Sequence, residues 1–346
     1  MIINLRSDTQ TLPTEEMLEA MRHAPLGDDV FGEDPTVNRL EEMSADKLGK
    51  EAALFVASGT MGNLCALMSH TRPGDEVILE AESHTYYYEA GGYATLAGLS
   101  PRMVRGKAGI MSIGKIQEAL RPQNIHFPVT TLLCIENTHN RGGGTIYSAG
   151  LTDDIIRFAH RQGLKVHIDG ARIFNAAVAL GIEAKELVKN ADSVMFCLSK
   201  GLSAPVGSVL VGSRTFIERA RKVRKMLGGG MRQAGVLAAA GIVALEKMVD
   251  RLTEDHVNAR YIAEELMKVN SLQIDLNTVQ TNMVYCDISQ TKVSAIRLSA
   301  LLKEKGLLVS PVPPSKIRLV TNRQISREDA GKAVEIIKKV IKDSLL

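Results

Sequence analysis

Cysteine is scarce in this sequence. The 346 residues contain four, at Cys65, Cys134, Cys197 and Cys286. They lie far apart and show no Cys-x-x-Cys spacing, so neither a disulfide framework nor a zinc site is expected, and we predict no metal ligands among the functional residues. The pattern indicates buried, reduced thiols in a cytoplasmic protein.

Long hydrophobic runs are also missing. The first fourteen residues carry charge and a proline where a signal peptide needs an apolar stretch. The longest apolar run, Val236 to Leu245, is interrupted by Gly241 and is too short to span a membrane, so it predicts a buried helix. The 42 basic and 39 acidic residues are spread along the chain and give a net charge of +3. This mild, mixed balance argues against a nucleic-acid partner and supports only a slight attraction for anionic small molecules. Because no apolar run is long enough to span a membrane, we expect no membrane partner.

Short apolar runs alternate with longer helical patterns over the first two thirds of the chain. Runs that are apolar on both faces are typical of strands covered on both sides, as in the mainly parallel sheet of an α/β domain. The candidate strands are Ala53–Val56, Glu76–Leu79, Leu132–Glu136, Val166–Asp169, Ser193–Leu198 and Ser208–Val211.

The pattern changes after a helical stretch at Gln233–Asp250. A charged helix, Leu252 to Val269, is followed by the segments Thr281–Asp287, Ala295–Lys305 and Lys316–Thr321 and by a terminal helix from Arg327. We therefore predict a large domain with an N-terminal arm over residues 1–246 and a small C-terminal α+β domain over residues 247–346.

Lys200 stands directly after an apolar strand and before a stretch that contains Gly201, Pro205 and Gly207. A lysine at a strand end can be delivered into a crevice, where partial desolvation lets its amine attack an aldehyde and form a Schiff base. A lysine that caps the strand and points into solvent explains this motif equally well when it is taken alone.

A second strand ends on Asp169, and Arg172 follows three residues later. A buried carboxylate beside a pyridine nitrogen keeps that nitrogen protonated, which is what makes pyridoxal phosphate (PLP) an electron sink. Asp169 could instead cap the next helix, and Arg172 could either brace the structure or bind a carboxylate through two parallel hydrogen bonds.

Ser58, Gly59 and Thr60 follow the first strand and open an apolar helix. Small residues at a helix start leave backbone N–H groups free to bind an anion such as a cofactor phosphate, although they also form ordinary helix caps.

Two histidines are candidates for stacking on a cofactor ring and for acting as general base. His84 lies among aromatic residues after the second strand, and His126, in Asn-Ile-His-Phe, is the weaker candidate. A structural role for either imidazole stays open.

A basic stretch that includes Lys225 precedes three consecutive glycines and Arg232. The charges are typical of a solvated helix face, whereas the glycines indicate unusual dihedral angles or a close approach of the backbone, such as a place where a neighbouring subunit reaches an active site.

Together these motifs favour a PLP enzyme, and the lack of a Gly-x-Gly-x-x-Gly motif after the first strand argues against a nicotinamide enzyme. Nearly end to end, the chain resembles the low-specificity L-threonine aldolases. The stretches that carry the resemblance are Leu5-Arg-Ser-Asp-Thr9, Gly27-Asp-Asp-Val-Phe-Gly-Glu-Asp-Pro-Thr36, Ile135-Glu-Asn-Thr-His139, His167-Ile-Asp-Gly-Ala-Arg-Ile-Phe-Asn175, Leu198-Ser-Lys-Gly201, Gly228-Gly-Gly-Met-Arg-Gln233 and Arg318-Leu-Val-Thr321.

The resemblance implies a fold of the aspartate-aminotransferase type and the retro-aldol cleavage of threonine or allo-threonine to glycine and acetaldehyde. For the cofactor ring, it implies that Lys200 holds the cofactor, Asp169 faces the pyridine nitrogen and His84 stacks on the ring. It implies that the cofactor phosphate is bound by Ser58, Gly59 and Thr60, and that the cofactor is reached from a second subunit by Lys225 and Arg232. It implies that the substrate carboxylate is held by Ser7, Arg172 and Arg318. It also implies a homotetramer with shared active sites.

Two residues depart from the family pattern. Phe31 replaces a usual tyrosine, which removes a phenol hydroxyl, and Asn322 replaces a usual histidine. We expect these changes to affect side-chain preference and rate, while a structural cation near the loops of Thr9 and Ser203 stays an open question. Two other functions also remain open: a different PLP reaction on the same fold, such as transamination, β-elimination or racemisation, and a catalytically silent PLP-fold protein.

Overall fold

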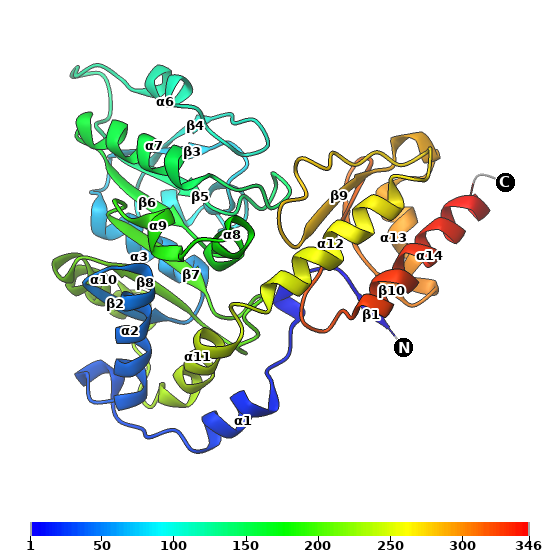
Figure 1. Cartoon of the computed structure of the whole chain (residues 1–346). Helices are drawn as coiled ribbons and strands as arrows, with labels where there is room; N and C mark the ends of the chain where they lie inside the picture. Colours follow the sequence, from blue (N-terminus) through cyan, green and yellow to red (C-terminus); the bar gives the residue numbers. More distant parts are fainter. Residues whose placement is uncertain (1, 345–346) are drawn as a thin grey trace.

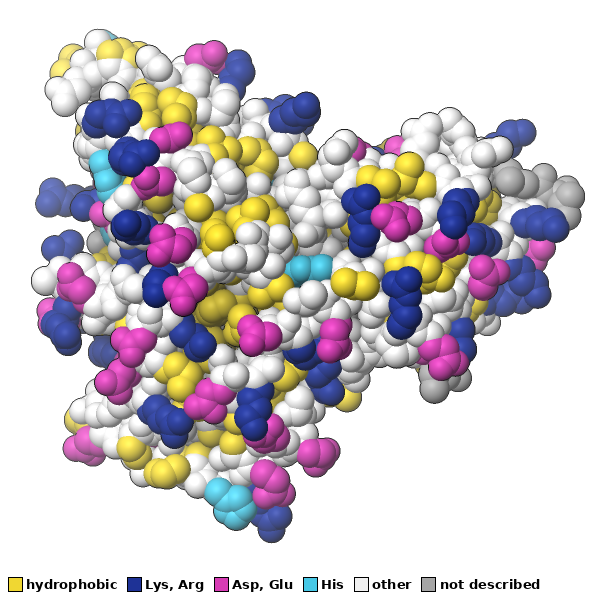
Figure 2. Space-filling view, in the orientation of Figure 1, with side chains coloured by type: hydrophobic (Ala, Val, Ile, Leu, Met, Phe, Trp, Pro, Cys, Tyr) yellow, Lys and Arg dark blue, Asp and Glu magenta, His cyan; other side chains and the backbone are white. Residues whose placement is uncertain are grey.

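A computed structural model describes residues 2–344 of the chain. Figure 1 shows two parts. The larger part is built around a central sheet, and the smaller part is built mainly from the C-terminal residues. Figure 2 shows acidic and basic side chains interspersed over the visible face, in keeping with the balanced composition. In residues 2–344, no helix has the length and apolar character that crossing a membrane requires.

The central sheet has seven strands in the order β2-β8-β7-β6-β5-β3-β4. All neighbouring pairs are parallel except those that involve β8, which runs antiparallel to both β2 and β7. The strands are β2 (Ala52–Val56), β3 (Glu76–Glu80), β4 (Ser100–Val104), β5 (Thr130–Glu136), β6 (Lys165–Asp169), β7 (Ser193–Cys197) and β8 (Ser208–Gly212). The six predicted strands are confirmed, and β4 was not predicted.

The sheet is buried on both faces, as the apolar runs predicted. Alternate residues of one strand enter different cores: Phe55 packs in the largest hydrophobic cluster, and Leu54 and Val56 pack in a second cluster on the opposite face. The second cluster is closed by the helices α3 (Gly59–His70) and α10 (Arg214–Met226). Each fully buried leucine or phenylalanine of this kind stabilises the fold by about 1.5–3 kcal/mol.

The opposite face and the connections carry the remaining helices of the large part. These are α1 (Glu15–Arg22), α2 (Pro35–Leu48), α4 (His84–Tyr87), α5 (Gly92–Thr95), α6 (Ile113–Ala119), α7 (Ala149–Arg161), α8 (Ile173–Leu180), α9 (Ala184–Val188) and α11 (Gly235–Lys247), together with the 3₁₀ turns η1 (Asp8–Gln10) and η2 (Asp29–Phe31). The apolar run from Val236 is the buried helix α11, as predicted.

The smaller part is an antiparallel sheet covered by helices. Its elements are α12 (Leu252–Leu266), β9 (Met283–Asp287), the 3₁₀ turn η3 (Ser289–Thr291), α13 (Ala295–Glu304), β10 (Leu307–Leu308), β11 (Ser310–Val312), β12 (Lys316–Val320) and α14 (Arg327–Ser344). The fold class is therefore α/β with a mainly parallel sheet and a small α+β part, as predicted.

The N-terminal strand β1 (Ile3–Asn4) differs from expectation. It pairs with β10, and Ile3 packs in the core of the smaller part, although the sequence suggested an arm of the large domain. Helix α12 contributes Leu252 to the large core and Ala259 to the small one, so it joins the two parts. A boundary at residues 246/247 stays a prediction.

Candidate active site

The carboxyl ends of β2, β3, β5, β6 and β7 lie along one edge of the sheet, because these strands are mutually parallel and only β8 is reversed. The residues that follow these ends converge there, as is usual for ligand crevices in open α/β sheets. The edge brings together candidates that are far apart in sequence, among them Ser58, His84, Asp169 and Lys200.

A cavity of about 300 Å³ opens at this edge, between the large and the small part. Its lining includes five residues predicted from the sequence: Ser7, His84, Arg172, Lys200 and Arg318. The other lining residues are Thr9, Tyr88, Asn140, Tyr285, Ser310, Pro311 and Val312. Because β1 pairs with the small part, the N-terminal arm carries Ser7 and Thr9 across to this cavity.

Asp169 is buried at the end of β6, beside the cavity. Its Oδ2 accepts a hydrogen bond from Asn63 Nδ2 at 2.9 Å, and its Oδ1 accepts one from the backbone N–H of Ala171 at 3.1 Å. These two hydrogen bonds fix the orientation of the Asp169 carboxylate.

His84 begins helix α4 and has an imidazole that is one-third exposed. Its Nδ1 lies 3.0 Å from Oε1 of the buried Glu89, so the proton on Nδ1 is donated to that carboxylate and Nε2 is left for a ligand. Burial opposes the charged imidazole, but the hydrogen bond with Glu89 and the nearby Asp169 carboxylate outweigh it and raise the pKa of His84.

Glu136, at the end of β5, fixes two lining residues through the backbone. Its two oxygens accept hydrogen bonds from the N–H groups of His84, at 2.6 Å, and Asn140, at 2.8 Å. The side chain of Asn140 in turn accepts a hydrogen bond from Arg318 Nη1 at 3.1 Å. Arg318 Nη2 donates to the carbonyl of Arg6 at 3.1 Å, and its buried Nε has no hydrogen-bond partner among the described residues.

Arg172 has a partner that sequence reasoning missed. Its Nε and Nη2 donate two parallel hydrogen bonds to the carboxylate of Asp8, each at 2.7 Å, and both side chains are buried. Burial opposes ionisation of Asp8, but the charge of Arg172 prevails and lowers the pKa of Asp8 to about 2. The Nε/Nη2 edge of Arg172 therefore faces Asp8, in keeping with a bracing role, while the residue also lines the cavity, so its binding of a substrate carboxylate stays a prediction.

The start of α3 lies against β7. A Cβ built on Gly59 would lie 3.0 Å from Cys197 Sγ, and one on Gly62 would lie 2.6 Å from Met195 Cγ, so a larger residue at either position would force a side chain of β7 to move. Ser58 caps the helix through Met61 N–H, which leaves the first N–H groups of a twelve-residue helix available to an anion.

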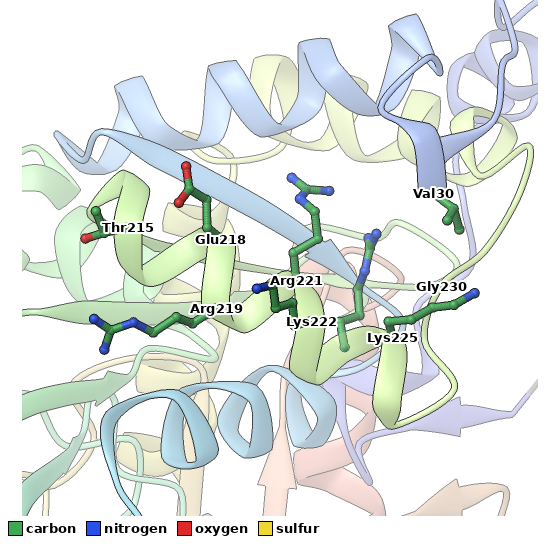
Figure 3. A pocket seen from close by; sticks show the side chains of 9 residues that line it. Val30, Thr215, Glu218, Arg219, Arg221, Lys222, Lys225 and Gly230 are labelled. Carbon is green, nitrogen blue, oxygen red and sulfur yellow. The ribbon is translucent and has the colours of Figure 1, made fainter.

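Asp169, Ser58, Gly59 and Thr60 lie at or just after strand ends at the same edge of the sheet but are not in the cavity lining, and three further predicted residues lie elsewhere. His126 lies in an exposed segment before β5, at the opposite end of the strand from Glu136, and outside the cavity lining of its own chain. Lys225 lies along α10, where Figure 3 shows it beside Gly230 in a separate cavity of about 780 Å³ that is lined mainly by basic side chains. Arg232 is exposed and pairs with Asp28 at 2.8 Å.

Phe31 and Asn322, the two residues that depart from the family pattern, also lie outside the cavity lining. Phe31 is 72 % exposed, close to Arg232, and Asn322 is buried at the end of β12, where its Oδ1 accepts a hydrogen bond from Gln324 N–H. Neither side chain contacts the cavity within the described chain. The triple glycine behaves as predicted, with Gly228 at φ +80° and Gly229 packed closely on Met61.

His84, Glu89 and Asp169 have the composition of a metal site, with one potential ligand atom each within 4.8 Å of one another. The amide of Asn63, however, donates to both carboxylates, at 2.8 and 2.9 Å. These N–H groups and the imidazole of His84 hold the two carboxylates in a hydrogen-bonded cluster.

Sequence reasoning missed Asp8, Asn63, Glu89 and Glu136. Asp8 and Glu136 lie within the stretches that resemble the known family, which is the one signal that could have identified them. Asn63 and Glu89 end the stretches that begin with Ala57 and Glu82, but no role could be assigned to them from sequence. The packing of α3 against β6 reveals Asn63, and the hydrogen bonds with Asn63 and His84 reveal Glu89.

Comparisons with known proteins identify the family. The family model for β-eliminating lyases matches residues 4–289. The low-specificity L-threonine aldolase 1 of Arabidopsis thaliana is 48% identical over 94% of this chain and 93% of the relative, and the low specificity L-threonine aldolase of Escherichia coli K12 is 46% identical over 94% and 96%. The solved threonine aldolase of Leishmania major superposes with a TM-score of 0.85, at 18% identity, over 98% of this chain and 99% of that one, which supports the fold. The chain belongs to the β-eliminating lyase family and, within it, to the low-specificity L-threonine aldolases.

Proposed function

We propose that this protein is a PLP-dependent aldolase that cleaves L-threonine and L-allo-threonine to glycine and acetaldehyde. One observation carries the proposal: a single cavity of about 300 Å³ is lined by an amine, Lys200, an imidazole, His84, and a guanidinium, Arg318. The relatives named as L-threonine aldolases support the choice of substrate.

The residues present fit pyridoxal phosphate. Lys200 would hold it through its amine, Asp169 would face the pyridine nitrogen, and the N-terminus of α3 at Ser58, Gly59 and Thr60 would bind its phosphate. The support is the start of the twelve-residue helix α3, where the Ser58 side chain caps only the Met61 N–H, and the fixed orientation of the Asp169 carboxylate. When bound, the cofactor supplies an electron sink for the pair released by the breaking Cα–Cβ bond.

Arg318 would bind the substrate carboxylate, with Ser7 and the remaining nitrogen of Arg172 beside it. The Nε of Arg318 is buried and has no hydrogen-bond partner within residues 2–344, and a substrate carboxylate would satisfy this donor. Asn140 and the Arg6 carbonyl hold this guanidinium in place, so it can orient the Cα–Cβ bond.

His84 would receive the β-hydroxyl proton at Nε2, directly or through a water. As that proton leaves, the hydroxyl oxygen forms the carbonyl of acetaldehyde and the Cα–Cβ bond breaks. A proton then returns to Cα to give glycine. Glu89 would keep Nδ1 protonated throughout, which leaves Nε2 as the nitrogen that accepts a proton.

The test is Lys200→Ala. We expect it to lose the visible absorbance of bound PLP and the release of acetaldehyde from L-threonine. Lys185→Ala, which changes a lysine that is 46% exposed in its side chain, is the matched control and should retain both. Full aldolase activity in Lys200→Ala would refute the proposal.

A homotetramer with shared active sites is part of the proposal. Its support is the location of Lys225, Arg232 and His126 outside the cavity of their own chain, where a second subunit could use them. Figure 3 shows Arg221, Lys222 and Lys225 projecting from α10, a basic surface suited to an anionic group presented by a partner. A cytoplasmic location is supported by the four unpaired cysteines.

A further inference from the structure

Asn63 occupies a position between two carboxylates of the site. Its Nδ2 lies 2.8 Å from Glu89 Oε1 and 2.9 Å from Asp169 Oδ2, and the side chain is 1% exposed. An amide nitrogen carries two hydrogens, so each carboxylate receives one. The opposite orientation would set the amide oxygen against two carboxylate oxygens.

The amide oxygen of Asn63 faces a histidine. Oδ1 lies 3.1 Å from His167 Nε2, and because Oδ1 can only accept, Nε2 must carry a proton. Burial lowers the pKa of His167 to about 4, so the ring is neutral at physiological pH and its Nδ1 is an acceptor. That acceptor lies 2.8 Å from the hydroxyl of Ser193, its register partner on the neighbouring strand.

The chain of hydrogen bonds continues to His70. Ser193 donates its one hydroxyl proton to His167, so it must accept from His70 Nε2, which lies 2.8 Å away. The ring of His70 is held by stacking on Phe216, at 4.3 Å between centroids and 16° between planes. His70 and Asn63 are seven residues apart and share one face of α3, with His167 and Ser193 between them.

We propose that Asn63 is a positioning residue that fixes the carboxylates of Asp169 and Glu89 with a single side-chain amide. The neutral imidazole of His167 sets the direction of that amide. In the series of hydrogen bonds from His70 through Ser193, His167 and Asn63, each group donates to the next one. The series ends at the carboxylates of Asp169 and Glu89, which both act as acceptors. The inference rests on the proposed function, because it assigns Asp169 to the cofactor ring and Glu89 to His84.

The first test uses the unaltered protein without cofactor. Nitrogen NMR of the histidine-labelled chain should show His167 protonated at Nε2 and unprotonated at Nδ1 across neutral pH, and the signal should be absent in His167→Gln. Protonation at Nδ1, or titration near the ordinary value for histidine, would overturn the inference. This result does not depend on catalysis.

The second test is the dissociation constant of added PLP, measured by absorbance. Asn63→Asp removes both donors and should weaken binding roughly 10- to 100-fold, the range for a lost charge-assisted hydrogen bond. His167→Leu, which cannot donate to Asn63, should weaken binding by about tenfold, whereas His167→Gln, which can donate, should stay within about threefold of the unaltered protein.

Asn258→Asp is the matched control, because Asn258 is another buried asparagine, 7% exposed, that donates to the Ile325 carbonyl away from the site. It should leave PLP binding unchanged. Unchanged binding of PLP in a folded Asn63→Asp variant would overturn the inference. If that variant does not fold, the NMR measurement of the His167 tautomer in the unaltered protein still tests the inference. Failure of the unaltered protein to bind PLP would refute the proposed function and leave the tautomer result standing.

Discussion

Asp8→Asn tests the most consequential contact that the sequence did not reveal. The substitution keeps the size of the side chain and removes the charge that faces Arg172, whose guanidinium is buried with it at 2.7 Å. Leaving one partner of a buried ion pair uncompensated costs about 3–5 kcal/mol of unfolding free energy. With an unfolding entropy of ~2.1 cal/mol/K per residue over the whole chain, the melting temperature should fall by about 4–7 °C.

The loss should have a defined pH dependence. The folded-state pKa of Asp8, about 2, lies below the ordinary value of 3.8, so its contribution is present above about pH 4 and is lost as the pH falls toward 2. The difference between Asp8→Asn and the unaltered protein should therefore be constant near neutral pH and should shrink only in acid. Calorimetry at several pH values measures it.

The same substitution should impair catalysis. Arg172 would lose the partner that fixes its guanidinium beside the substrate, and kcat/KM for L-threonine should fall roughly 10- to 100-fold, as expected for one hydrogen bond to a charged group. Glu76→Gln is the control, because it breaks a buried carboxylate–Arg121 pair at 2.8 Å, outside the cavity lining. It should destabilise the fold and leave KM unchanged. An Asp8→Asn variant with normal stability and kinetics would refute the reasoning.

Three further predictions follow from the same contacts. Glu89→Gln removes a carboxylate that raises the pKa of His84. Because His84 must be neutral to accept a proton, the acid limb of the plot of kcat/KM against pH should move to lower pH, and an unmoved limb would contradict this role. Arg318→Gln should lower kcat/KM for L-threonine by about 10- to 100-fold, mainly through KM, in a steady-state acetaldehyde assay; an unchanged KM would count against carboxylate binding. Gly62→Ala would place a Cβ 2.6 Å from Met195 and should destabilise the fold by about 1–3 kcal/mol in denaturant unfolding, and a variant of equal stability would show that the helix can move.

The central sheet was predictable because its strands are buried on both faces. Such strands are short apolar runs bounded by polar turns, and Glu76–Glu80 and Ser193–Cys197 match their predicted positions to within a residue. Strand β4, Ser100–Val104, has only one fully buried residue and begins Ser-Pro-Arg, so it lacks that pattern. The pairing of Ile3 with Leu307 joins the two ends of the chain, and no local pattern encodes it.

The location of the candidate site was predictable where a particular side chain follows a strand end, as with Lys200 and Asp169, whose roles stay predictions. It was not predictable where a residue acts through a neighbour. In the sequence, nothing distinguishes Asn63 from other polar residues of an apolar helix. Its role follows from the packing of α3 against β6, the strand that carries His167 and Asp169. Arg172 shows the converse: its position was anticipated, but the carboxylate that it faces, Asp8, comes from 164 residues earlier in the chain.

The central claim is that the protein breaks a carbon–carbon bond of threonine, and product analysis tests it most directly. The PLP-loaded protein, given L-threonine, should release acetaldehyde and glycine in equal amounts, with little keto acid or ammonia. Ammonia and keto acid formed in place of acetaldehyde would indicate elimination or transamination and would contradict the account.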